Sequence, residues 1–249
     1  MLYIPKRPRN GSEVIAFQKE FMKLMGSDLP VVCLDTPTEV EELIVPGQGF
    51  GLGRMIEGTQ EFRDAIGARF AKDVKPEGAE KLYISRSLLP SGRGNLIGEA
   101  ELEAHLKDAG YTIYHPQKHD LHHQIATYKA ARQIIAAEGS SLHLLAMVAR
   151  SDQEVAIVVR RPSGATRQLE KHLKNFAGIA PVMINQLTRS WKPLGAAKPR
   201  LWKGELDMPG LQKALIAAGF LTKGGKGWKS LSNKEVKAQL GDKFEEVVS

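Results

Sequence analysis

Over residues 81–186, segments with the hydrophobic pattern of a strand alternate with segments that have the hydrophobic spacing of a helix. Short apolar runs typical of strands end at polar or turn residues, and segments with apolar residues at helical spacing follow them. The predicted strands are 82–85, 111–115, 133–137, 155–160 and 180–186, and the predicted helices are 97–109, 121–131, 141–150 and 167–176. Strands joined by helical crossovers predict an α/β fold with a parallel, doubly wound sheet of Rossmann type.

The sequence on either side of this alternation has a weaker pattern. Before it, helical spacing at 12–25 and 58–70 and strand-like runs at 30–35 and 42–46 precede a polar linker at 72–80. After it, an apolar segment at 211–218 and a capping box from Ser232 to Glu235 predict two short helices. We therefore expect a reduced N-terminal α/β part (1–75), a Rossmann-like domain (80–188) and a basic helical appendage (189–249).

The predicted third strand leads directly into a turn and a helix. Gly139, Ser140 and Ser141 form this turn, and free backbone N–H groups at a helix N-terminus favour an anion, most often phosphate. A tight connection without a ligand is the alternative. Ligands of doubly wound sheets bind at the carboxyl ends of the strands, which favours the anion site.

Two arginines belong to the same predicted edge of the sheet. Arg86 ends the first predicted strand, and Arg93 follows in a loop rich in glycine, serine and proline. Guanidinium groups donate paired hydrogen bonds to phosphate oxygens, so both residues are candidate ligands of a diphosphate.

Four further residues are candidates at this edge. His115 closes the second predicted strand, where it could move a proton or bind a hydroxyl group, and a loop histidine without a role is the alternative. Glu138 ends the third strand and is either a general base or a ligand of a ribose. His143 follows on the next helix, where it could orient Glu138 or face the ligand, and Gln124 could contact the ligand from the side.

No metal or cofactor is expected. His119, His122 and His123 are close in sequence, but the adjacent pair points in different directions on a helix and no carboxylate recurs at ligand spacing beyond Asp120.

Composition limits the partners and the compartment. The chain has a net charge of +7 and a pI of about 9.4, which favours an anionic partner, and the C-terminal segment from residue 189 mixes lysines with tryptophans. No apolar run is long enough to cross a membrane, no secretory signal is apparent, and the single Cys33 fits a reducing compartment. We expect a cytoplasmic protein, with peripheral contact at the inner face of the membrane as a second expectation.

These residues together resemble the catalytic domain of glycosyltransferase family 61, in the bacterial type associated with capsular polysaccharide biosynthesis. The resemblance covers residues 30–162 and runs through the strand end Tyr83-Ile84-Ser85-Arg86, then Arg93, the helix at 99–110, Gln124, Ala130-Ala131 and residues 135–143. This sequence differs from the family pattern at two places. Many members have His at the position of Glu138 and Asn-Glu at the position of Gly98-Glu99.

The resemblance implies a GT-B-like architecture and an enzyme that transfers a sugar from a nucleotide diphosphate donor to a glycan or lipid-linked acceptor. Arg86 and Arg93 would hold the diphosphate, and residues 138–143 would line the nucleotide and the reaction centre. Glu138 or His115 would deprotonate the acceptor, without a metal and with inversion. The alternative is a non-catalytic module that binds a nucleotide sugar or nucleic acid, although nucleic acid is the less favoured partner.

Overall fold

The computed structural model describes residues 2–3, 16–34, 36–51, 53–90, 93–195 and 198–247. The chain divides into two compact units, residues 1–75 and 76–249, and the division falls inside the polar linker at 72–80. No helix in these described ranges is both long and apolar enough to cross a membrane.

The first unit contains short elements. Strand β1 (Leu2–Tyr3) pairs in parallel with β2 (Val32–Cys33), and the helices are α1 (Ala16–Leu24), α2 (Gln60–Arg69) and the 3-10 turn η1 (Gly53–Met55). The rings of Phe21 and Phe70 pack 4.6 Å apart. The apolar run at 42–46 was predicted as a strand but is irregular and exposed, because no neighbouring strand pairs with it in the described part of this unit.

A five-stranded parallel sheet forms the centre of the second unit and confirms the main prediction. Its strands are β3 (Lys81–Ile84), β5 (Thr112–Tyr114), β6 (Gln133–Ala137), β7 (Glu154–Val158) and β8 (Val182–Ile184). Their order is β5-β3-β6-β7-β8, so the direction of winding reverses between β3 and β6. A crevice at the carboxyl ends of these two strands is the expected ligand site of such a sheet.

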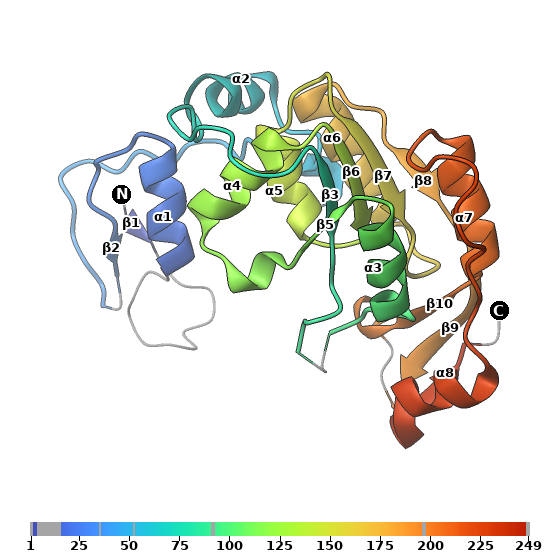
Figure 1. Cartoon of the computed structure of the whole chain (residues 1–249). Coiled ribbons are helices and arrows are strands. Elements are labelled where there is room, and N and C mark those ends of the chain that lie inside the picture. The colour runs from blue at the N-terminus through green and yellow to red at the C-terminus, as the bar shows by residue number, and fades with distance from the viewer. Residues whose placement is uncertain are drawn as a thin grey trace. The chain divides into compact units, whose positions relative to one another are not determined.

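Helices cover both faces of the sheet (Figure 1). On one face, α4 (Leu121–Ala130), α5 (Ser141–Val148) and α6 (Ala165–Ala177) pack side by side. On the other, α3 (Glu99–Asp108) and α7 (Met208–Ala217) bury leucines against alternate residues of the strands, among them Tyr83, Ile135 and Val158. Because both faces are covered, strands β6 and β7 are apolar at nearly every position.

The C-terminal segment contains a second sheet that the sequence did not predict. Helices α7 and α8 (Asn233–Leu240) match the two predicted helices. Between and around them lie β9 (Leu187–Pro193), η3 (Pro199–Leu201), β10 (Lys203–Leu206), η4 (Gly241–Lys243) and β11 (Phe244–Glu246). With β4 (Leu96–Ile97) these strands form a sheet of order β11-β9-β10-β4. The segment is therefore a mixed α/β extension of the second unit and not a helical appendage.

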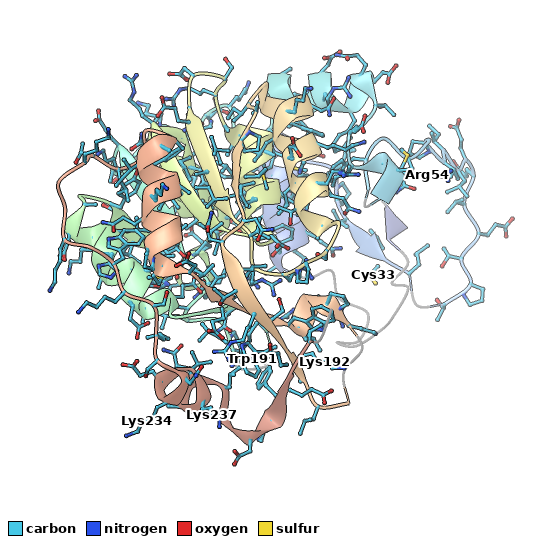
Figure 2. All side chains as sticks on the ribbon, turned by 90° about the vertical axis from the view of Figure 1, so that its right-hand side faces the viewer. Cys33, Arg54, Trp191, Lys192, Lys234 and Lys237 are labelled. Carbon is cyan, nitrogen blue, oxygen red and sulfur yellow. The ribbon has the colours of Figure 1, made fainter. Side chains whose placement is uncertain are left out.

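Ion pairs and side-chain hydrogen bonds hold this second sheet together. The guanidinium of Arg189 donates to both carboxylate oxygens of Glu205, at 2.9 and 2.8 Å, and the indole N–H of Trp191 donates to the same carboxylate. Figure 2 shows Trp191 and Lys192 on β9, with Lys234 and Lys237 on α8. Polar and basic residues are frequent in β9 and most of its positions are half-buried, so the usual apolar strand pattern is missing.

Candidate active site

The carboxyl ends of four adjacent strands bring the site together. His115 follows β5, Arg86 follows β3, Glu138 follows β6, and Arg160 and Arg161 follow β7. The ladder continues one residue past the strands, since Ser85 donates to the Tyr114 carbonyl at 2.9 Å and Glu138 to the Val158 carbonyl at 3.0 Å. The side chains of these residues therefore meet at the point where the strand order reverses.

Glu138 is the buried centre of an arginine cluster. Its side chain is 1% exposed, and one carboxylate oxygen accepts the Nε of Arg161 at 2.8 Å. The other accepts the backbone N–H of Arg160 at 3.2 Å and the hydroxyl of Thr166 at 3.3 Å. Both oxygens are therefore occupied by the protein, as a buried carboxylate requires.

Arg86 lies over the turn that follows β6. Its guanidinium donates to the carbonyl of Gly94, at 2.9 Å from Nη2. A Cβ atom on Gly139 would overlap Nη1 of Arg86, so any larger residue there would push the guanidinium away from the turn. The backbone and the guanidinium thus form one continuous surface.

The cluster carries more positive than negative charge. Burial lowers the pKa of Arg86, and the neighbouring charges of Arg161 and Arg93 lower it further, against the opposite effects of Glu99 and Glu138. Burial also lowers the pKa of Arg160 to about 10, with Arg86 as the next cause. The positive groups of Arg86, Arg160 and Arg161 therefore repel one another, and an anionic ligand would relieve this repulsion.

The turn itself presents backbone donors. Helix α5 begins at Ser141, and the backbone N–H groups of Gly139, Ser140 and Ser141 have no acceptor in the described part of the protein. Ser140 is exposed, so these donors face solvent at the positive end of the helix dipole.

A second cluster lies between the ends of β3 and β5. Gly98 adopts φ +83° and places Glu99 in the first turn of α3, where its Oε1 accepts the Tyr83 hydroxyl at 3.0 Å and the Arg86 N–H at 2.8 Å. Glu99 is 2% exposed, its Oε2 has no hydrogen-bond partner, and burial raises the pKa of its carboxyl group.

His115 is linked to this cluster through Glu103. Oε1 of Glu103 accepts the hydroxyls of Ser85 and Ser87, both at 2.5 Å, and lies 3.9 Å from Nε2 of His115. The Nδ1 atom of His115 is buried and has no hydrogen-bond partner. A half-buried imidazole with one unsatisfied nitrogen next to a carboxylate is suited to accepting or donating a proton.

Comparison with known families identifies the chain. The family model described as Glycosyltransferase 61 matches residues 1–158. The chain belongs to glycosyltransferase family 61. A search of curated proteins finds no match. The matched range ends with the last residue of β7, so Arg160, Arg161 and the whole C-terminal sheet apart from β4 lie beyond it.

The other predicted site residues of this glycosyltransferase have different surroundings. Arg93 is exposed on the loop after β3. Gln124 donates to the carbonyls of Pro116 and His119, both at 3.0 Å, and so fixes the loop after β5. The Nδ1 atom of His143 lies 2.9 Å from that of His172 on α6, and burial lowers the pKa of both imidazoles. His143 therefore joins α5 to α6.

Sequence reasoning missed four residues of the candidate site: Glu99, Glu103, Arg160 and Arg161. Arg160 ends the predicted strand 155–160 and Arg161 directly follows it, and this position alone could have indicated them. The two glutamates are one turn apart on α3, and only the pairing of β3 with its neighbours brings them to the edge of the sheet. Among the described residues, no group of three or more His, Cys, Asp or Glu side chains could hold a metal ion.

Proposed function

We propose that this glycosyltransferase uses a nucleotide diphosphate sugar as donor and binds its diphosphate between β3 and β6. The gathering of three guanidiniums around the single carboxylate of Glu138, at the N-terminus of α5, carries the proposal. Arg86 and the N–H groups of residues 139–141 would donate to the phosphate oxygens, with Arg161 and the exposed Arg93 nearby.

The same groups would stabilise the departing diphosphate. Charge develops on the leaving phosphate as the glycosidic bond breaks, and fixed guanidiniums and amides stabilise such charge without reorganisation. The reaction we propose is therefore metal-independent, and we propose inversion because the family resemblance implies it. We further propose a GT-B-like architecture, in which the second unit binds the donor and the unit at 1–75 contributes to acceptor binding.

We propose His115 as the general base and assign Glu138 a positioning role. Glu138 is 1% exposed and is held by Arg161, Arg160 and Thr166, whereas the side chain of His115 is 16% exposed and its Nδ1 has no partner. The acceptor would be a glycan or a lipid-linked glycan of a cell-surface polysaccharide. Twelve Lys and Arg against six Asp and Glu in residues 189–249 support peripheral contact with an anionic membrane from the cytoplasm.

Calorimetry with a panel of nucleoside diphosphates tests the donor class. We expect micromolar binding of at least one of them to the full chain, and a loss of ten-fold or more in Arg86→Ala. Arg132→Ala is the matched control, because Arg132 is exposed and lies at the opposite edge of the same sheet, just before β6. Failure of every nucleotide to bind, together with salt-sensitive retention on DNA, would refute the proposal.

A further inference from the structure

Three rings form a compact group beyond the end of β5. The rings of Tyr114 and His123 are within 6° of parallel, and the Tyr114 hydroxyl lies 3.0 Å from Nδ1 of His123. The ring of His119 is nearly parallel to both, with centroid distances of 4.8 Å to Tyr114 and 4.2 Å to His123. His119 therefore stacks on a pair of rings that a hydrogen bond holds together.

The surrounding backbone fixes this group in place. The 3-10 turn η2 (Pro116–Lys118) leads into His119, whose carbonyl accepts the side-chain amide of Gln124. Asp120 caps α4 by accepting the N–H of His123 at 2.7 Å. His119 itself is exposed. Desolvation and then the neighbouring His123 lower the pKa of His119, so its ring is neutral at neutral pH.

The position of this group relative to the arginine cluster follows from the sheet. Tyr114 pairs with Ile84, two residues before Arg86, and β6 with Gly139 lies on the other side of β3. Two strand spacings, about 10 Å, therefore separate the ends of β5 and β6. The rings also lie on the side of α4, which packs against α5. An extended nucleoside diphosphate has a comparable span between its base and its terminal phosphate.

We propose that His119, supported by Tyr114 and His123, is the stacking platform for the nucleobase of the donor. The nucleoside would run along the edge of the sheet, with its ribose near Ser85 and its diphosphate at Arg86 and Gly139. A planar base of any type can stack on the ring, so the platform provides affinity and not a choice among bases. This inference rests on the proposed nucleotide diphosphate donor.

Binding of two probes to the full chain separates the base from the phosphates. The probes are the tightest nucleoside diphosphate of the panel and inorganic pyrophosphate. We expect His119→Ala to weaken binding of the nucleoside diphosphate about ten-fold and to leave pyrophosphate binding unchanged, because stacking on a ring contributes only to the former. His119→Phe should restore the nucleotide affinity, since it keeps a planar ring. His122→Ala is the control, as it removes an imidazole three residues further along the chain, in the first turn of α4.

Different failures identify which idea is wrong. Equal weakening of both probes in His119→Ala, or an unchanged nucleotide affinity, would refute the platform but leave the diphosphate site standing. Absence of binding of every nucleoside diphosphate to the unmodified protein would refute the proposed donor, and the platform with it. Thermal unfolding of each variant shows whether a loss of binding reflects loss of the fold.

Discussion

Replacing Glu138 with glutamine separates a positioning role from a catalytic one. The substitution keeps the shape of the side chain but removes the carboxylate charge that pairs directly with Arg161, and it leaves three buried or half-buried guanidiniums around a neutral amide. Breaking a buried ion pair by removing one partner costs about 3–5 kcal/mol. One kcal/mol lowers the melting temperature of a unit of this size by roughly 2–4 °C, so the expected decrease is roughly 6–20 °C.

Thermal unfolding with and without inorganic pyrophosphate is the assay for Glu138→Gln. Pyrophosphate should raise the melting temperature of the variant more than that of the unmodified protein, because the anion replaces the missing carboxylate charge. Asp152→Asn is the control: its ion pair with Arg150 is exposed, and we expect little change. Undiminished stability of Glu138→Gln together with abolished turnover would contradict the reasoning and make Glu138 the general base.

Three further predictions follow from the same contacts. We expect His115→Ala to lower kcat by about 100-fold or more and to leave nucleoside diphosphate affinity within two-fold, measured by turnover and calorimetry; parallel losses would exclude a role as base. Burial raises the pKa of Glu99, so the folded state binds the proton of this carboxyl group more tightly than the unfolded state and loses stability as pH rises above about 4.5. The melting temperature of Glu99→Gln should therefore increase relative to that of the unmodified protein from pH 4 to pH 8. A difference in melting temperature that does not change with pH would contradict this reasoning. A Cβ on Gly204 would overlap the backbone oxygen of Arg160, so Gly204→Ala should destabilise the unit by about 1–3 kcal/mol and weaken nucleotide binding. Gly225 has open space around it, so Gly225→Ala should have neither effect.

Sequence reasoning predicted the central sheet because its strands are buried on both faces. Continuous apolar runs such as 133–137 have few alternatives to a parallel strand, and the helices between them fix the winding. The second sheet could not be predicted in this way. Strand β9 is half-buried and contains Arg189 and Lys192, and its place in the fold depends on pairing with β10 and with the distant β11.

The candidate site was predictable where one strand end defines it. Arg86 and Gly139 each follow a strand in sequence, and parallel pairing brings them into contact. The state of Glu138 was not predictable, because its partners Arg161 and Thr166 come from a different crossover. Sequence alone left Glu138 as a base or a ribose ligand, and its occupied oxygens now favour a structural role.

A crystal structure of the chain with its tightest-binding nucleoside diphosphate tests the central proposal most directly. We predict that phosphate oxygens lie within hydrogen-bond distance of the N–H groups of Gly139 and Ser140 and of the guanidinium of Arg86. A diphosphate bound elsewhere, such as in the open pocket at the opposite edge of the sheet near Lys81 and Arg132, would contradict the account.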